Sequence, residues 1–400
     1  MRLLYIHQYF KTPNEPGGTR SYWIAKKLID KGNEVTIITS SNKISQNKEI
    51  KNIDGIKVIY IKVPYNQKMN VFYRLISFVR FMLKSTYEAL KVKNIDLVIA
   101  TSTPLTIGFP ALILKKIKKI PYLFEVRDLW PEVPIQMGAL KNKLLVKLAI
   151  TFEKKIYENS IHIIALSPGM KEGILKRNIA NSKITVIPNM SKINEFWPRE
   201  KNTELIKKLG LQVNSFKIIH FGSIGLANGV FTIIETAKLL KNNTEIEIIF
   251  IGGGSQETVM KKKCEQYNLK NVFFLGEFPM KTTSEIVNFC DVSIVSFLDL
   301  PILYTNSPNK LFDSLSAGKP IIVNSAGWTK ELVENNGCGL YVNPNNPSDL
   351  VEKIHYLKSN NEILTKMGGE SRKLAQNKYD KEILSDKFVE VINSIKLIEK

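Results

Sequence analysis

Cysteine and histidine are scarce in this 400-residue sequence, and neither is spaced to bind a metal ion. The three cysteines, Cys264, Cys290 and Cys338, lie too far apart for a zinc motif or a framework of disulfides. We therefore expect reduced, mostly buried thiols, which are typical of a cytoplasmic protein. The histidines stand apart from one another, at His7, His162, His220 and His355.

Long hydrophobic runs are also missing. The longest uncharged run, residues 97–114, contains Pro104, Gly108 and Pro110, so we expect a strand, a loop and a helix rather than a membrane span. The amino terminus becomes polar too soon for a signal peptide. There is no Walker lysine loop, Gly-x-Ser-x-Gly elbow or Asp-x-Asp motif, so we expect neither a bound metal nor another cofactor.

Acidic residues are few in the first half of the chain. Residues 1–198 hold 32 Lys and Arg against 14 Asp and Glu, a net charge of +18, whereas the remaining residues hold 25 against 23. An excess confined to one half indicates an anionic partner, either nucleic acid or an anionic membrane surface, unless it is only a solvated surface.

Two helical stretches in the basic half combine cationic and apolar side chains. Residues 68–93 are apolar on more than one side, and residues 141–155 repeat the pattern. Such helices lie in membrane interfaces, although a packed helix with a basic outer face gives the same pattern. The aromatic residues of 72–81 read as buried rather than free to stack on bases, so we expect no nucleic acid partner.

Short apolar strands alternate with helices, which predicts parallel sheets with helices on both faces. Because 400 residues exceed one ordinary core, we expect an α/β protein of two doubly wound, Rossmann-like domains, 1–195 and 196–383, with a ligand cleft between them. The expected strands are 3–7, 35–39, 58–63, 97–100, 122–126, 162–166, 184–187, 217–221, 246–251, 272–275, 292–297 and 321–323. The expected helices are 19–31, 70–92, 106–119, 141–158, 169–177, 229–241, 256–267, 282–290, 309–317 and 328–335, followed by a helical tail.

Residues 306–320 carry the most specific pattern. Ser307 and Asn309 are N-cap types before a helix of about three turns, which Gly318 ends. A helix N-terminus beside Lys310 is an anion site, and the carboxylate of Asp313 can hold a pair of hydroxyls. Together they suit a nucleotide sugar, with the diphosphate at the helix end and the ribose on Asp313.

This segment resembles the donor-site signature of family 4 glycosyltransferases, in which two glutamates precede Ala-x-Gly-x-Pro. Asp313 stands at the second glutamate and Thr305 at the first, whose role is either dispensable or passes to another residue, with Asp299 and Asn306 as nearby candidates. The resemblance implies the GT-B architecture, retention of anomeric configuration, and a last helix, here 384–400, that crosses back onto the first domain. The Ser-Pro-Asn-Lys form resembles a subgroup for bacterial capsule and O-antigen synthesis, including WbuB-like N-acetyl-L-fucosamine transferases.

Glycine-rich turns follow four of the expected strands, and such turns let backbone N–H groups approach phosphate. The resemblance places the turn with Gly17 and Gly18 near the donor diphosphate, and the region of Glu277 near the nucleotide base. The other two donor-side turns contain Gly222 with Asn228, and Gly253.

One of these turns departs from the family pattern. Many relatives carry an arginine and a lysine in the turn where this chain has Ser223 and Asn228. Lys310 is therefore the leading candidate for the cation that faces the diphosphate, and Arg20 is a second. A lysine there would stabilise the leaving group as its charge develops.

Residues 125–132 place three acids and an arginine after the strand 122–126. The Arg-Asp-Leu-Trp-Pro-Glu sequence resembles the subgroup's version of a loop that often carries histidine in this family. We expect Asp128 to act on the acceptor side, where a carboxylate can help to remove a hydroxyl proton, and Arg127 to steer the ligand. A structural loop held by ion pairs would give the same composition.

These features predict an enzyme that moves a sugar from a UDP-sugar to a polyprenyl-diphosphate-linked saccharide at the cytoplasmic face of the cell membrane. A GT-B nucleotide-sugar 2-epimerase is an alternative, which the basic membrane-seeking half disfavours. A basic nucleic-acid-binding protein is a second alternative, which salt-sensitive duplex binding would reveal.

Overall fold

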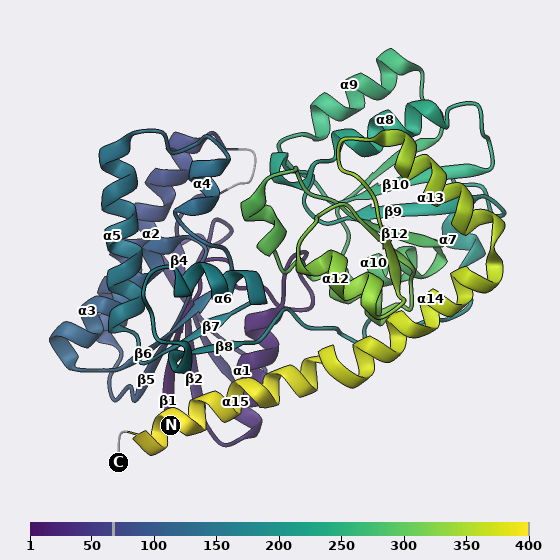
Figure 1. Cartoon of the computed structure of the whole chain (residues 1–400). Coiled ribbons are helices and arrows are strands. Elements are labelled where there is room, and N and C mark those ends of the chain that lie inside the picture. The colour runs from purple at the N-terminus through teal and green to yellow at the C-terminus, as the bar shows by residue number, and fades with distance from the viewer. Residues whose placement is uncertain (66–68, 399–400) are drawn as a thin grey trace. The chain divides into compact units, whose positions relative to one another are not determined.

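The computed structural model describes residues 1–65 and 69–398, which form two compact units (Figure 1). Unit 1 comprises Met1–Thr12, Gly18–Pro188 and Glu382–Lys400, and unit 2 comprises Pro13–Gly17 and Asn189–Lys381. The main change of unit falls after Pro188, seven residues before the boundary expected from the sequence. Lys68, one end of the predicted basic helix, lies outside the described residues.

Within the described residues, unit 1 has an eight-stranded sheet in the order β3-β4-β2-β1-β5-β6-β7-β8. Its central strands are runs of buried residues, so helices must cover both faces. The strands are β1 (Arg2–Ile6), β2 (Glu34–Ser41), β3 (Lys48–Ile53), β4 (Ile56–Lys62), β5 (Leu97–Thr101), β6 (Tyr122–Val126), β7 (His162–Ala165) and β8 (Ile184–Val186). The helices are α1 (Arg20–Asp30), α2 (Val71–Lys91), α3 (Gly108–Lys118), α4 (Glu132–Gln136), α5 (Lys143–Asn159) and α6 (Pro168–Leu175).

Unit 2 has a parallel sheet, six-stranded in the part of the chain that is described, in the order β11-β10-β9-β12-β13-β14. The strands are β9 (Phe216–Phe221), β10 (Ile246–Ile251), β11 (Val272–Gly276), β12 (Val292–Val295), β13 (Ile321–Val323) and β14 (Gly339–Tyr341). The helices are α7 (Thr203–Lys208), α8 (Phe231–Leu239), α9 (Glu257–Tyr267), α10 (Met280–Phe289), α11 (Asn309–Ser316), α12 (Trp328–Asn335), α13 (Pro347–Ser359) and α14 (Asn361–Leu374).

Alternation along the strands of unit 2 divides its core into two clusters. Ile218 and Ile248 belong to one cluster, whereas their neighbours Ile219 and Ile249 belong to the other. Successive side chains of a strand point to opposite faces, so each face of the sheet packs on its own layer of helices. This arrangement leaves the carboxyl ends of the strands, and the turns that follow them, free to form a site.

The last helix, α15 (Lys381–Ile398), belongs to unit 1 from Glu382 onward. Phe388, Ile392 and Ile395 are buried, and Lys27 of α1 pairs with Asp386 at 3.3 Å. The end of the chain therefore packs on the domain with which the chain begins.

The observed elements match most of those predicted, with instructive exceptions. The sequence does not reveal β3, a strand without a buried residue that has four charged or amide side chains and pairs antiparallel with β4. The prediction that the sheets are wholly parallel is therefore wrong at this edge of unit 1. Short elements were also missed, namely β14, α4 and α7. Residues 97–114 form β5, a 3₁₀ turn and the start of α3, as predicted.

Cys264, Cys290 and Cys338 are all buried and unpaired with one another in the described structure, as expected. No helix among the described residues has the length and apolar character that a membrane crossing requires.

Candidate active site

The turns that follow β9, β10 and β11 are joined by backbone hydrogen bonds. Gly222 N donates to Ile251 O at 2.8 Å, and Gly252 N donates to Gly276 O at 2.8 Å. Gly252 has φ of 115°, and a Cβ there would lie 1.9 Å from Gly222 O, so only glycine fits. The three turns therefore form one hydrogen-bonded layer at the carboxyl edge of the sheet.

Five of the residues predicted to face the donor come together here, four in this layer and Lys310 in α11. A Cβ on Gly253 would lie 3.0 Å from the Glu277 carboxylate, so these two residues are neighbours. A Cβ on Gly222 would lie 3.7 Å from the Lys310 side chain, and Asn228 Oδ1 accepts a hydrogen bond from Lys310 at 3.2 Å. The structure thus collects residues that are far apart in the sequence at one edge of unit 2.

Lys310 has an unusual environment for a lysine. Its Nζ lies 2.7 Å from His220 Nε2, its side chain is 8% exposed, and no carboxylate pairs with it in the described part of the chain. Burial lowers the pKa of Lys310 to about 7. Burial and the neighbouring Lys310 also hold the pKa of His220 well below its ordinary value, so the neutral imidazole accepts from the ammonium. A buried cation without a carboxylate is suited to an anionic ligand.

The start of α11 differs slightly from the prediction. Pro308 occupies the N-cap, Asn309 is the first helical residue, and no described side chain caps the helix. Ser307 was expected to cap it, but its Oγ accepts from Asn189 N at 3.1 Å instead. The expectation that Ser307 caps α11 is therefore wrong. Ser307 lies one residue before the N-cap position, and its hydroxyl already accepts a hydrogen bond from Asn189. Leu311 N donates to Pro308 O at 3.1 Å, so among the described residues the N–H groups of Asn309 and Lys310 are the first-turn donors that remain for another acceptor.

Asp313, the predicted ribose ligand, lies in the second turn of α11 and is 7% exposed. Its Oδ1 lies 2.8 Å from Lys192 Nζ. Burial raises the pKa of Asp313, and Lys192 opposes that shift. A ribose diol bound by Asp313 would therefore share the carboxylate with Lys192.

This buried pair leads to a prediction about stability. We expect Asp313→Asn to lower the free energy of unfolding by about 3 kcal/mol, because Lys192 keeps its charge inside the protein without a partner. The second change, Lys192→Met, should restore part of the loss, since it removes the stranded charge. Urea unfolding of both single variants and the double variant measures the coupling. If the effects of the two changes on the free energy of unfolding are additive, the interaction between Asp313 and Lys192 contributes nothing to stability.

The glycine-rich turn after β1 has Gly17 at φ of 128°, a conformation that favours glycine, and Gly18 leads into α1. The neighbouring Arg20, which we expected as a second phosphate-binding cation, does not fill that role. It is 1% exposed, its Nε donates to Glu125 at 2.8 Å, and its two terminal nitrogens donate to Ile187 O and Pro188 O. The guanidinium ties three chain segments of unit 1 together, using three of its five N–H donors, and its burial keeps it away from a ligand.

Arg127 and Asp128 lie at the carboxyl edge of the unit 1 sheet, directly after β6. Arg127 Nη1 lies 3.2 Å from Nε2 of His7, which follows β1, and Thr103 Oγ1, after β5, donates to Asp128 Oδ2 at 2.6 Å. Since β1, β5 and β6 are neighbouring parallel strands, their ends bring these side chains together. Burial raises the pKa of Asp128, which makes the carboxylate a better proton acceptor.

The other two acids of this loop have structural partners. Glu125 is fully buried against Arg20 and also accepts from Thr101 at 2.9 Å. Glu132 begins α4 and faces Arg177 at 3.6 Å. Asp128 is therefore the acid of the 125–132 loop that remains for chemistry.

Sequence reasoning missed several partners in these sites. His220 and Lys192 were not singled out, yet they contact the two principal residues of α11. His220 lies near the end of β9, and Lys192 lies in the segment after β8. Residues at or after the carboxyl ends of parallel strands are candidates for a ligand site, so these positions could have pointed to both residues. Among the described residues, no group of three or more His, Cys, Asp and Glu side chains is placed to hold a metal ion.

Comparison with known protein families accounts for both units. Residues 17–191 match the model for Glycosyltransferase Family 4, and residues 201–374 match the model for Glycosyl transferases group 1. The chain is a glycosyltransferase of the family 4 type with the GT-B fold. The predictions of an enzyme, of its class and of two doubly wound domains are thus confirmed.

This glycosyltransferase is similar to curated proteins at modest identity. An uncharacterized glycosyltransferase of Methanocaldococcus jannaschii is 23% identical over 82% of this chain and 81% of its own length. WcaI of Escherichia coli, a glycosyl transferase named for colanic acid biosynthesis, is 23% identical over 63% of this chain. That match spans 62% of WcaI, which is less than two thirds of its length.

Solved structures share the fold of this glycosyltransferase over nearly its whole length. Sucrose-phosphate synthase from Thermosynechococcus elongatus is similar at a TM-score of 0.80 and 15% identity, over 99% of both chains. HepE of Anabaena, in complex with UDP-glucose, is similar at a TM-score of 0.72 and 17% identity, over 98% of this chain and 100% of HepE.

Proposed function

We propose that this glycosyltransferase moves a sugar from a UDP-sugar to a polyprenyl-diphosphate-linked saccharide in the synthesis of a capsular polysaccharide or O-antigen. The observation that carries the proposal is Lys310, a buried cation at the start of α11 with which no carboxylate of the described residues pairs. The likeness to HepE, which binds UDP-glucose, supports the donor class. The likeness to WcaI, which is named for colanic acid biosynthesis, supports a polysaccharide product.

The donor half of the reaction follows from unit 2. The diphosphate of the UDP-sugar accepts hydrogen bonds from Lys310, from the first turn of α11 and from the turns with Gly222 and Gly253, while the region of Glu277 receives the base. When the bond between the anomeric carbon and the diphosphate oxygen breaks, negative charge grows on UDP, and Lys310 stabilises it. The positive charge comes from the protein, so this role needs no divalent cation.

The acceptor half follows from unit 1. A hydroxyl of the acceptor saccharide forms the new bond to the anomeric carbon, and Asp128 takes its proton. Arg127, held by His7, orients the acceptor. The products are the extended saccharide, UDP and one proton. By family resemblance the anomeric configuration is retained, and by subgroup resemblance the sugar is N-acetyl-L-fucosamine.

The acceptor class also sets where the reaction takes place. A polyprenyl diphosphate is anchored in a bilayer by its hydrocarbon chain, so the enzyme must work at the membrane surface. We infer a peripheral association with the cytoplasmic face of the cell membrane, supported by the basic excess of residues 1–198.

Calorimetric titration of UDP into the protein, with EDTA present, tests the donor site. We expect binding in the micromolar range, which corresponds to a binding free energy of about −8 kcal/mol. EDTA should not prevent this binding, because the cation that meets the diphosphate is Lys310 and not a metal ion. Asp313→Ala should weaken this binding if the carboxylate holds the ribose. Absence of UDP binding with and without Mg²⁺ would contradict the proposed donor, and binding only with Mg²⁺ would contradict the role of Lys310.

A further inference from the structure

Helix α2 carries a continuous stripe of apolar side chains that the protein does not bury. The intervals along the stripe are three, four, four and four residues, which place all members on one face of the helix. Their exposed fractions run from 45% to 66%, for Phe72, Leu75, Val79, Leu83 and Tyr87. We call these five residues the α2 stripe.

The opposite face of α2 is fully packed. Phe78 is 7% exposed, Phe81 and Ala89 are 0% exposed, and Ser77 donates to Pro64 O, outside the helix, at 2.5 Å. The α2 stripe is therefore not the inner face of a loosely attached helix. The expectation that the aromatic residues of 72–81 are buried holds for Phe78 and Phe81 and is wrong for Phe72 and Tyr73.

Basic residues border the α2 stripe. Arg80, Lys84 and Lys91 lie along one side of it, and the sole acid in the sequence of α2 is Glu88. Glu88 is paired with Lys48 at 2.9 Å and with Lys91 at 3.2 Å. The face is thus apolar along its centre and positively charged along its side.

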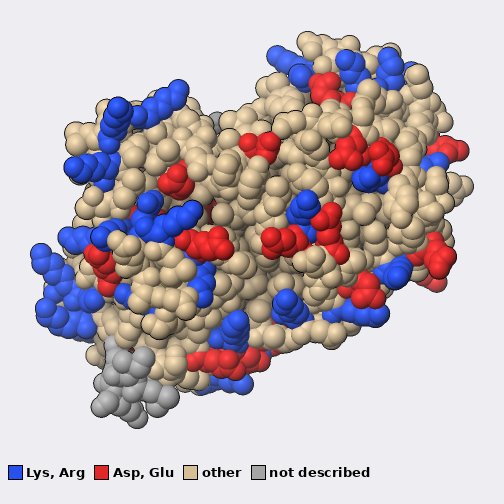
Figure 2. Space-filling view, viewed as in Figure 1, with Lys and Arg blue, Asp and Glu red and all other residues tan. Residues whose placement is uncertain are grey.

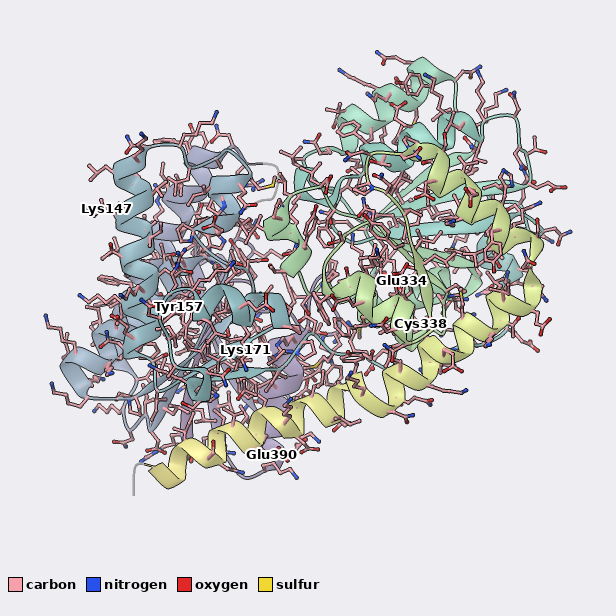
Figure 3. The ribbon with its side chains drawn as sticks, viewed as in Figure 1. Lys147, Tyr157, Lys171, Glu334, Cys338 and Glu390 are labelled. Atoms are coloured by element: carbon pink, nitrogen blue, oxygen red, sulfur yellow. The ribbon has the colours of Figure 1, made fainter. Side chains whose placement is uncertain are left out.

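Helix α5 repeats this combination. Leu144, Leu145 and Leu148 are 52% to 66% exposed, and Lys147 lies among them. Figure 3 labels Lys147 in the amino-terminal half of α5 and Tyr157 near its other end, where Tyr157 is buried and donates to Glu153 at 3.0 Å. Helix α3 packs against both α2 and α5. Figure 2 shows Lys and Arg side chains gathered over the region of unit 1 where α3 and α5 lie.

We propose that the α2 stripe and the exposed leucines of α5 form a docking surface for an anionic lipid bilayer. The apolar side chains enter the boundary between headgroups and acyl chains, and the flanking lysines and arginines meet the lipid phosphates. Leu75, Val79 and Leu83 are aliphatic and neither stack on bases nor form hydrogen bonds, which favours lipid over nucleic acid. The inference rests on the proposed function, because a membrane-anchored acceptor requires such a surface.

Vesicle sedimentation tests the surface directly. The full chain is mixed with vesicles of phosphatidylcholine alone, or with vesicles that contain phosphatidylglycerol in equal parts. We expect stronger binding to the anionic vesicles, weakened by added salt. The triple variant Leu75→Gln, Val79→Gln, Leu83→Gln should bind the anionic vesicles at least about tenfold more weakly, since it removes the apolar contact and keeps every charge.

A matched variant controls for the loss of surface leucines and valines in general. Leu239, Val259 and Ile383 are also exposed on helices, and changing all three to Gln should leave vesicle binding unchanged. Equal vesicle binding by the wild type and the α2 triple variant would overturn the proposal. So would preferential binding of duplex DNA over anionic vesicles at the same salt, lost in the triple variant.

Titration of UDP in the absence of lipid separates this inference from the proposed function. Both triple variants should bind UDP as the wild type does, which also shows that they are folded. A chain that binds UDP but not anionic vesicles would overturn the docking surface alone. A chain that binds vesicles through the α2 stripe but does not bind UDP would overturn the proposed donor alone.

Discussion

Replacing Lys310 with methionine is expected to lower kcat/KM for the UDP-sugar by about 100-fold or more. Methionine fills a similar volume, so the loss reports the missing charge at the leaving diphosphate rather than a cavity. Steady-state kinetics with the UDP-sugar, together with UDP titration, measure the effect. Lys319, a lysine of unit 2 whose Nζ donates to Asn288 O, is the matched control, and Lys319→Met should keep the affinity for UDP.

The pH dependence of UDP binding gives a second view of Lys310. The pKa of about 7 in the free protein means that the amine is largely neutral above that pH. A bound diphosphate stabilises the ammonium, so binding takes up a proton, and the affinity should fall as the pH rises from about 7 to about 9. In Lys310→Arg the charge persists and the profile should be flat. A wild-type affinity that does not change over this range would contradict the assignment.

Asp128→Asn is expected to lower kcat by about 100-fold or more while the affinity for UDP stays unchanged. Asparagine preserves the shape and can still accept from Thr103, but it cannot take a proton from the acceptor hydroxyl. Transfer to a lipid-linked saccharide measures the loss, and calorimetry with UDP shows that the donor site is intact.

Glu132 offers a control acid from the same loop. It faces Arg177 rather than Asp128, so Glu132→Gln should retain transfer. Thr103→Val should lower kcat less than Asp128→Asn does, because it removes a hydrogen bond to Asp128 and leaves the carboxylate in place. Full transfer by Asp128→Asn would remove Asp128 from the mechanism.

The sequence predicts the elements well where periodicity and burial agree. The buried run of Tyr122–Val126 and the helix of Trp328–Asn335 have the predicted bounds. The exposed β3 and the short helix α4 lack such a signal, because neither is dominated by buried apolar residues. Because β3 was not predicted, its antiparallel pairing with β4 at the edge of the unit 1 sheet was not predicted either.

The candidate site was predictable in part, for a physical reason. Glycine turns and the lysine of α11 are recognisable from local patterns, and the structure brings Gly222, Asn228 and Lys310 together. The partners His220 and Lys192 depend on contacts across 90 and 121 residues of sequence, which no local pattern reveals. For the same reason Arg20 looked like a free cation, although its partners Glu125 and Pro188 bury it.

The return of α15 to unit 1 has a consequence for the order in which the protein forms during synthesis. Unit 1 contains both the first residues and those from Glu382 onward, whereas unit 2 is complete at Lys381. The ribosome therefore finishes every residue of unit 2 before it completes α15. This helix supplies Asp386, which pairs with Lys27, and Phe388, which is buried in unit 1. The domain that is begun first is the last to be closed, contrary to the usual order from the amino terminus.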